Sequence, residues 1–228
     1  MESSKRIAIL LLGGSAKRFG GNTPKQLLPV NGKPLFCYAL DSLSSSPEID
    51  EIILVVRADL EGEVKSIVKK RSYTKPIQYV HGGDSRSESV HHAIAYLSKK
   101  NIFDEAIILI QDADRPHLDE RLIKEGIEKA METGASVTAI PCTDSVFIST
   151  DLNHVSFYQP RETTFLAQTP QTFRLSSLKK LSFAEISTDE ASQVHALGET
   201  VSIVMGSPNN YKINYPEDLE RFAKEGTK

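Results

Sequence analysis

The hydrophobic positions of the chain form short continuous runs, separated by stretches in which apolar residues recur every three or four positions. Continuous runs are typical of strands covered on both faces, and the longer period is typical of helices. The pattern predicts strands over residues 7–12, 52–56, 77–80, 106–110, 137–140 and 201–205. It predicts helices over residues 34–43, 60–70, 84–99, 119–133 and 187–197, the last with a capping box of Ser187 and Glu190, and a final helix from Pro216. Such regular alternation predicts an α/β fold with a doubly wound, mostly parallel, Rossmann-like sheet.

Between residues 142 and 164 this alternation breaks. Two β-prone pieces, residues 146–148 and 155–158, flank the polar segment 151–153. They predict a hairpin inserted between core elements of a single domain spanning residues 1–228. A hairpin with alternating apolar residues needs a surface that covers it. That surface is either the hairpin's own domain or a second subunit, and the residues leave both alternatives open.

Composition and charge exclude several classes of partner. The 228 residues carry a formal net charge of -3, so no basic excess is available to neutralise the phosphates of a nucleic acid. No apolar stretch has the length that spans a bilayer, and the residues before the first strand leave no room for a signal peptide. Cys37 and Cys142 lack metal-type spacing and are expected as buried thiols. We therefore expect a cytoplasmic protein with no nucleic-acid or membrane partner.

The first predicted strand ends at Gly13-Gly14, and a basic, glycine-rich loop follows. Glycine lets a backbone approach a ligand closely and lets N–H groups face an anion. Arg18 and Lys25 bring two cations to the same loop, which favours a phosphate-rich nucleotide as the ligand. The spacing is that of neither the P-loop nor the dinucleotide fingerprint. The alternative is an ordinary glycine turn with a solvated arginine and lysine.

Further candidate sites follow the predicted strands at the same rim of the sheet, where open α/β sheets bind ligands. They are Gly82-Gly83-Asp84, the pair Asp112 and Arg115, and the segment around Lys212. Each has an ordinary alternative: Asp84 as a helix N-cap, Asp112 in a solvated acidic turn, and Lys212 on an exposed edge strand. Their shared rim favours a common site, because unrelated features need not all fall on one edge.

The chemistry that such a rim suits is nucleotidyl transfer, in which a substrate phosphate attacks the α-phosphate of a nucleoside triphosphate. The attacking oxygen is already anionic, so no general base is required. The site must hold two repelling anions in line and stabilise the added charge, which calls for cations and a divalent ion. We predict Asp112 as the carboxylate that holds the divalent ion. The predicted cations are Arg18, Lys25, Arg161 and Lys212.

Six motifs follow one another along the chain. They are Gly-Gly…Arg18-Phe-Gly…Pro24-Lys25-Gln26, Gly82-Gly83-Asp84-Ser-Arg86-Ser-Glu-Ser89-Val90, Asp112-Ala-Asp-Arg115-Pro116, Gln168-Thr169-Pro170-Gln171-Thr-Phe173, Thr188-Asp189-Glu190-Ala191-Ser192 and Tyr211-Lys212-Ile213. Together they resemble the 2-C-methyl-D-erythritol 4-phosphate cytidylyltransferase family of the non-mevalonate isoprenoid pathway, over nearly the whole chain. The resemblance implies a nucleotidyltransferase-type fold and transfer of a cytidylyl group from CTP to the sugar-alcohol phosphate. Mg²⁺ or another divalent cation would take part, and pyrophosphate would leave. The alternatives are a ribitol-5-phosphate cytidylyltransferase and a non-catalytic nucleotide-binding homologue.

The resemblance also implies roles for individual residues. Arg18 and Lys25 would hold the triphosphate, and they would act as catalytic cations with Arg161 and Lys212. The residues that would line the nucleotide pocket are Leu12, Gly13, Gly14, Gly83, Asp84, Ser89, Asp112 and Ala113. The residues that would meet the acceptor are Arg115, Ser145, Arg161, Thr169, Thr188 and Lys212. In this family the inserted hairpin reaches over a second subunit, so the resemblance implies a homodimer in which Ser145 and Arg161 act on the partner's substrate.

Four residues depart from the usual pattern of the family. Ala16 stands where glycine is often found, and Asp114 stands where alanine is usual. Ser145 replaces the usual threonine, and Asn209 falls where an acidic residue is common. These departures cluster on the acceptor side of the expected site.

Overall fold

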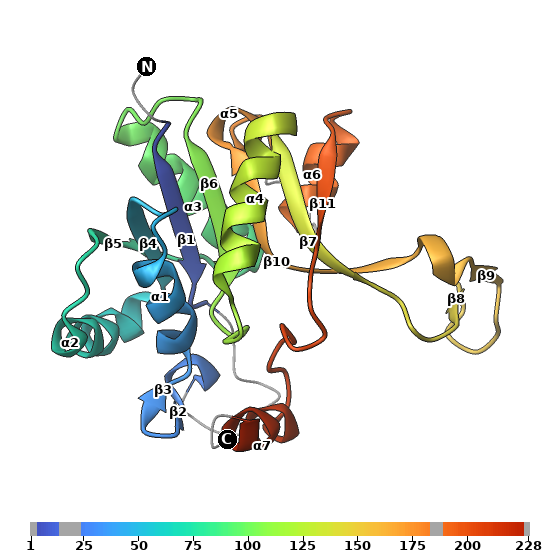
Figure 1. Ribbon diagram of the computed structural model, residues 1–228, viewed down its shortest axis with the longest axis horizontal. Helices are drawn as coiled ribbons and strands as arrows, with labels where there is room; N and C mark the ends of the chain where they lie inside the picture. The colour runs from blue at the N-terminus through green and yellow to red at the C-terminus, as the bar shows by residue number, and fades with distance from the viewer. Residues whose placement is uncertain (1–3, 14–23, 183–188, 226–228) are drawn as a thin grey trace.

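The structure is a computed structural model, and it describes residues 4–13, 24–182 and 189–225. A seven-stranded sheet forms its centre, in the order β11-β7-β10-β6-β1-β4-β5 (Figure 1). The strands are β1 (Arg6–Leu11), β4 (Glu51–Val56), β5 (Ile77–His81), β6 (Ile107–Asp112), β7 (Ala135–Pro141), β10 (Phe165–Arg174) and β11 (Val201–Met205). β1 lies parallel to β4 and β6, β4 to β5, and β7 to β11. The predicted doubly wound, mostly parallel sheet is confirmed.

Helices cover both faces of the sheet. They are α1 (Phe36–Ser45), α2 (Glu61–Arg71), α3 (Arg86–Lys99), α4 (Glu120–Thr133), α5 (Leu175–Leu178), α6 (Glu190–Ala196) and α7 (Pro216–Glu225). Alternate side chains of the buried strands point to opposite faces. One core joins Leu10 and Leu54 to α1, α2 and α4, and the other joins Ile9 and Ile53 to α3, α5 and α6.

A third, smaller core holds α7 below the rim of the sheet. Ile213 and Phe222 pack there against Val30 and Leu35. Val30 belongs to a two-stranded ribbon of β2 (Pro29–Val30) and β3 (Lys33–Pro34), and the 3₁₀ helix η1 (Lys25–Leu27) precedes that ribbon. This packing brings the C-terminal part of the chain back to the end of β1.

The sequence pattern missed β10, which lies antiparallel between β6 and β7. Gln168, Thr169, Gln171 and Thr172 interrupt its apolar pattern, yet each is at most 5% exposed. Three of these side chains hydrogen bond inside the fold: the amide of Gln168 donates to the carbonyl of Ser207, while Thr169 and Gln171 accept from backbone N–H groups. A strand with buried, partnered polar residues cannot be recognised from hydrophobic periodicity.

Two expected helix starts are wrong. The N-cap of α3 is Ser85, which accepts from the N–H of Glu88, rather than Asp84. The N-cap of α6 is Asp189, which accepts from the N–H of Ser192. Ser187 of the expected capping box lies outside the described residues, and the carboxylate of Glu190 bonds Arg86.

The predicted hairpin forms an arm that leaves the sheet between β7 and β10. Its strands β8 (Val146–Ile148) and β9 (Phe157–Gln159) pair antiparallel, and the 3₁₀ helix η3 (Arg161–Thr163) follows. Figure 1 shows the arm projecting sideways from the sheet, so the arm does not fold over its own domain. Its exposed apolar side chains are Phe147, Ile148, Leu152, Val155, Phe157, Tyr158, Phe165 and Leu166.

In the part of the chain that the structure describes, no helix combines the length and the apolar character that a membrane crossing requires.

Candidate active site

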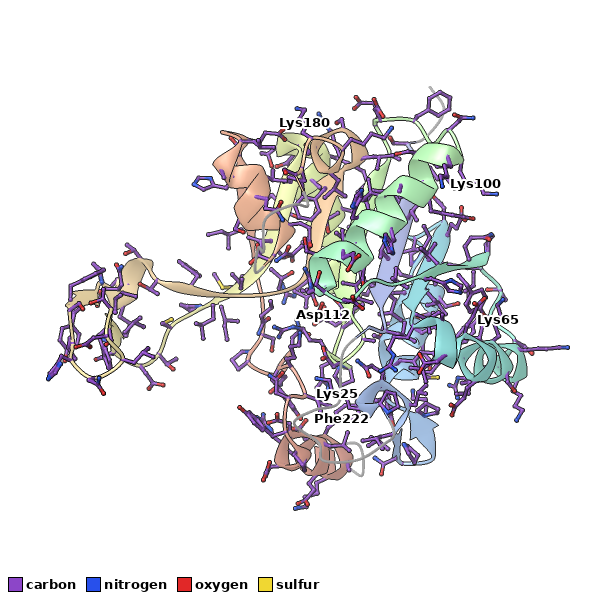
Figure 2. The ribbon with its side chains drawn as sticks, turned by 180° about the vertical axis from the view of Figure 1, so that it is seen from behind. Lys25, Lys65, Lys100, Asp112, Lys180 and Phe222 are labelled. Atoms are coloured by element: carbon purple, nitrogen blue, oxygen red, sulfur yellow. The ribbon has the colours of Figure 1, made fainter. Side chains whose placement is uncertain are left out.

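The carboxyl ends of β1, β5 and β6 meet at one rim of the sheet, as the sequence predicts for parallel strands. Figure 2 shows Asp112 at the end of the central strands, and Lys25 between Asp112 and the helix that carries Phe222. The other labelled lysines, Lys65, Lys100 and Lys180, lie on outer surfaces. The rim therefore gathers charged side chains from segments far apart in the sequence.

A cavity of about 350 Å³ opens at one part of this rim. The hydroxyl of Ser89 accepts from the N–H of Gly83 at 3.1 Å and donates to the carbonyl of Ser85 at 2.9 Å. A Cβ atom at Gly82 would lie 2.9 Å from that hydroxyl, so glycine is needed there for close approach. The lining residues are Leu11, Gly13, Arg57, Gly83, Asp84, Ser85, Arg86 and Ser89. Backbone and hydroxyl groups beside an apolar strand end suit recognition of a flat heterocycle.

Beside the cavity, three carboxylates and three cations alternate. We call these residues the ion-pair row, and they are Glu190, Arg86, Asp112, Lys212, Asp114 and Lys25. Arg86 bonds Glu190 through Nη1 at 2.6 Å and Asp112 through Nε at 3.1 Å. Lys212 Nζ lies 2.8 Å from Asp112 Oδ2 and 3.7 Å from Asp114 Oδ1. Lys25 Nζ lies 2.6 Å from Asp114 Oδ2.

The ion pairs control the ionisation of the row. Burial alone would raise the pKa of Asp112, but the charges of Arg86 and Lys212 outweigh burial and hold the pKa well below its usual range. Burial would lower the pKa of Lys212, but Asp112 and Asp114 raise it. For Glu190, burial raises the pKa and outweighs the charge and hydrogen bond of Arg86, which lower it. Asp112 and Lys212 are thus held in their charged forms.

Backbone contacts hold the row in place. Thr169 Oγ1 accepts from the N–H of Asp112 at 3.2 Å. The carbonyl of Asp114 accepts from the N–H of Ile213 at 2.8 Å, and the carbonyl of Ile213 accepts from Lys25 at 2.7 Å. Nearby, Arg115 Nη1 donates to the carbonyl of Asn210 at 2.7 Å. Burial lowers the pKa of Arg115, against the charges of Asp112 and Asp114.

Several ordinary alternatives from the sequence are wrong. Lys25 is not a solvated loop lysine, because its side chain is 12% exposed and ion-paired. Asp112 does not lie in a solvated turn, since the residue is 7% exposed. Lys212 pairs with Asp112 and does not lie on an edge strand. These burials favour a built site over unrelated surface features.

The structure brings many of the predicted site residues together. Lys25, Asp112 and Lys212 belong to the ion-pair row, Thr169 and Arg115 adjoin it, and Gly13, Gly83, Asp84 and Ser89 line the cavity. Ala113 is buried beside the row, and its N–H donates to the carbonyl of Leu11. Leu12 points its side chain into the core, and its neighbours Leu11 and Gly13 line the cavity instead.

Other predicted residues lie elsewhere or outside the described residues. Ser145 and Arg161 belong to the arm and are exposed. Asn209 is exposed in the turn after β11. The predictions for Gly14, Ala16, Arg18 and Thr188 fall outside the residues that the structure describes.

Sequence reasoning missed Arg86 and Glu190 as members of the site. Both stood in recognised motifs, but Arg86 was given no role within the helix expected over residues 84–99, and Glu190 was expected as a capping partner. Their role is visible only in the fold, where Glu190 is buried and Arg86 reaches its carboxylate at 2.6 Å.

A divalent cation fits the donor chemistry of the row. Among the described residues there is no group of three His, Cys, Asp or Glu side chains that could hold a metal. Asp112 and Asp114 offer two carboxylates, and Asp114 Oδ1 is buried with no hydrogen-bond partner in the described part of the chain. Mg²⁺ is commonly bound by one or two carboxylates together with substrate phosphates. The row fits a cation that arrives with a nucleotide.

The comparison with known families decides the assignment of the chain. Residues 7–224 match the family model described as IspD: 2-C-methyl-D-erythritol 4-phosphate cytidylyltransferase. The chain belongs to this family. The 2-C-methyl-D-erythritol 4-phosphate cytidylyltransferase of Thermotoga neapolitana is 37% identical, over 94% of this chain and 93% of its own. The enzyme of the same name from Bifidobacterium longum strain DJO10A is 34% identical, over 96% of this chain and 80% of its own.

A solved structure of the family has the same fold. The crystal structure of 4-diphosphocytidyl-2C-methyl-D-erythritol synthase from Anaerococcus prevotii superposes with a TM-score of 0.82. It is 29% identical in sequence, and the match covers 99% of this chain and 97% of that one. The resemblance read from the six motifs is confirmed.

Proposed function

We propose that this chain transfers the cytidylyl group of CTP to 2-C-methyl-D-erythritol 4-phosphate at the rim formed by the cavity and the ion-pair row. The products are 4-diphosphocytidyl-2-C-methyl-D-erythritol and pyrophosphate. Family membership makes the chain a CTP-dependent nucleotidyltransferase of isoprenoid biosynthesis. The observation that supports the rim as its active site is the meeting of half-buried lysines and buried carboxylates beside a cavity of about 350 Å³.

The reaction requires positioning and charge compensation rather than proton abstraction. The oxygen that attacks the α-phosphate is an anion, so two anions must approach in line. We assign the triphosphate to Lys25 and Lys212, with Arg18, because ammonium and guanidinium groups stabilise the charge that develops on transferring phosphoryl oxygens. We assign cytosine to the cavity lined by Gly83, Asp84 and Ser89. Arg115, Thr169 and Thr188 would meet the acceptor.

Asp112 would hold Mg²⁺ or another divalent cation that arrives with CTP. When bound, such a cation neutralises phosphate charge and orients the leaving pyrophosphate. Arg86 supports this role, because it holds the Asp112 carboxylate at 3.1 Å on the side away from Lys212. The carboxylate is thereby kept ionised and pointed along the rim.

The arm would complete the site in a homodimer. Ser145 and Arg161 carry a hydroxyl and a charge suited to a phosphorylated acceptor, yet both belong to the arm, which projects sideways from the sheet (Figure 1). The arm also exposes a row of apolar side chains, including Phe147 at 52% and Tyr158 at 66%. If a second subunit covers this surface, Ser145 and Arg161 of one chain would lie over the rim of the other chain.

The test is pyrophosphate release from CTP across a panel of polyol phosphates. We expect turnover with 2-C-methyl-D-erythritol 4-phosphate, and Lys25→Ala should lower kcat/KM by about a hundredfold or more, the usual loss for a group that stabilises a transition state. A clear preference for ribitol 5-phosphate would overturn the assigned acceptor. Release by Lys25→Ala at the wild-type rate would overturn the assigned role of Lys25.

A further inference from the structure

Asp114 is the carboxylate of the ion-pair row that faces both lysines proposed as triphosphate ligands. Its residue is 7% exposed, and its Oδ2 atom lies 2.6 Å from Lys25 Nζ. Its Oδ1 atom lies 3.7 Å from Lys212 Nζ. The carboxylate of Asp114 therefore lies against both lysines to which we assign the substrate phosphates.

We infer that Asp114 makes nucleotide binding at this rim dependent on a divalent cation, by acting beside Asp112 as a second carboxylate toward the cation that accompanies the triphosphate. This inference rests on the proposed function, because it takes Lys25 and Lys212 as ligands of CTP. In this role Asp114 discriminates metal-bound from free nucleotide.

The charge balance of the row supports this role. Its three carboxylates and three cations already neutralise one another before any nucleotide enters. When the ammonium of Lys25 turns to a phosphate, Asp114 is left as a buried carboxylate next to an anion. A buried charge that loses its partner is strongly unfavourable, and a like charge nearby adds to the penalty. A divalent cation between Asp114 and the phosphates removes both penalties.

The geometry gives Asp114 the means to face that cation. Its Oδ1 atom is buried and makes no hydrogen bond within the described residues. Asp112 Oδ2 and Asp114 Oδ1 face the same ammonium, that of Lys212. The backbone of Asp114 is fixed by the N–H of Ile213, which donates to its carbonyl at 2.8 Å. Two fixed carboxylates completed by phosphate oxygens are a usual environment for Mg²⁺.

The experiment measures CTP binding by calorimetry, without acceptor, so that no turnover occurs. Wild type, Asp114→Asn and Asp114→Ala are each titrated with CTP in Mg²⁺ and in EDTA, after circular dichroism and a thermal melt have verified folding. We expect the dissociation constant of CTP from wild type to be at least about a hundredfold higher in EDTA than in Mg²⁺. In both variants this EDTA-to-Mg²⁺ ratio should be about tenfold smaller, the scale of a close buried charge interaction. The reduction should come from tighter binding of free CTP.

A matched control is Asp41→Asn. Asp41 is also held by a lysine, with Lys33 Nζ at 2.9 Å, but it lies in α1 rather than in the row. We expect this variant to keep the wild-type ratio. If wild type binds Mg²⁺–CTP and both Asp114 variants keep its ratio, the inference fails while the proposed function stands. If wild type binds no CTP in Mg²⁺, the proposed function itself fails.

Discussion

Each charged residue at the rim has an ionisation state set by its neighbours rather than by its own type. Asp112 is a buried carboxylate that stays ionised because Arg86 and Lys212 contact its two oxygens. Glu190 is also buried, but its burial outweighs the charge of Arg86, and the pKa of its carboxyl is raised. The pKa values of two acidic residues in one row are therefore shifted in opposite directions.

Asp112 provides a prediction about stability and pH. The pKa of Asp112 is lowered in the folded protein, so its stabilising contribution is present above the unfolded value of about 3.9 and is lost as the pH falls toward the folded value. We expect Asp112→Asn to lower the free energy of unfolding by about 3 kcal/mol at pH 7, because two cations lose a partner. The gap between variant and wild type should shrink at pH 3. Urea unfolding at both pH values measures it, and a constant gap would contradict the ion-pair explanation.

At the scale of elements, close contact between α4 and β10 fixes the central part of the sheet. Gly126 in α4 faces Thr172 of β10, and its carbonyl accepts from Ser136 of β7 at 2.8 Å. A Cβ atom at Gly126 would lie 2.9 Å from Thr172 Oγ1. The same packing supports the site, because β10 carries Thr169, which holds the backbone of Asp112.

A pair of glycine substitutions tests this contact. Gly126→Ala should lower the free energy of unfolding by about 1–3 kcal/mol, since overpacking outweighs the gain in helix propensity. Gly62→Ala is the control, because a Cβ atom at Gly62 in α2 meets nothing within 4 Å. That variant should be up to about 1 kcal/mol more stable than wild type. Equal stabilisation of the two variants in urea unfolding would show that α4 can move away from β10 without penalty.

At the scale of the whole molecule, the rim and the arm of one chain lie apart (Figure 1). The cavity and the ion-pair row lie at the rim of the sheet, whereas Arg161 contacts Thr143 and Glu162 within the arm. A site that needs both parts requires two copies of the chain. The proposed homodimer follows from this separation together with the exposed apolar arm.

Mixed dimers test whether sites are shared. Subunits of Lys25→Ala and of Arg161→Ala are each expected to be nearly inactive, but one site of the mixed dimer would combine an intact rim with an intact arm. Random mixing should then recover about one quarter of the wild-type activity. Mixing Lys25→Ala with Lys212→Ala is the control and should recover none, because both defects lie in the rim. Absence of recovery in verified mixed dimers of the first pair would indicate a site within one chain.

Most of the fold followed from local pattern. The predicted parallel strands and the hairpin are all present, because continuous apolar runs and turn residues act over a few positions. β10 escaped prediction because its polar side chains are buried, and those of Gln168, Thr169 and Gln171 are satisfied by partners distant in the sequence. The helix caps at Ser85 and Asp189 were missed by one and two residues, since several polar residues near each start could cap it.

Local pattern was enough to predict the parallel strands, the main helices, the glycines at the ends of β1 and β5, and the family of the chain. Which charges meet depends on the folded arrangement: Lys25 pairs with Asp114, and Arg86 pairs with both Asp112 and Glu190. The physical reason is range. Backbone propensity and apolar periodicity are expressed within one element, whereas an ion pair depends on where the folded chain brings residues that are up to 104 positions apart.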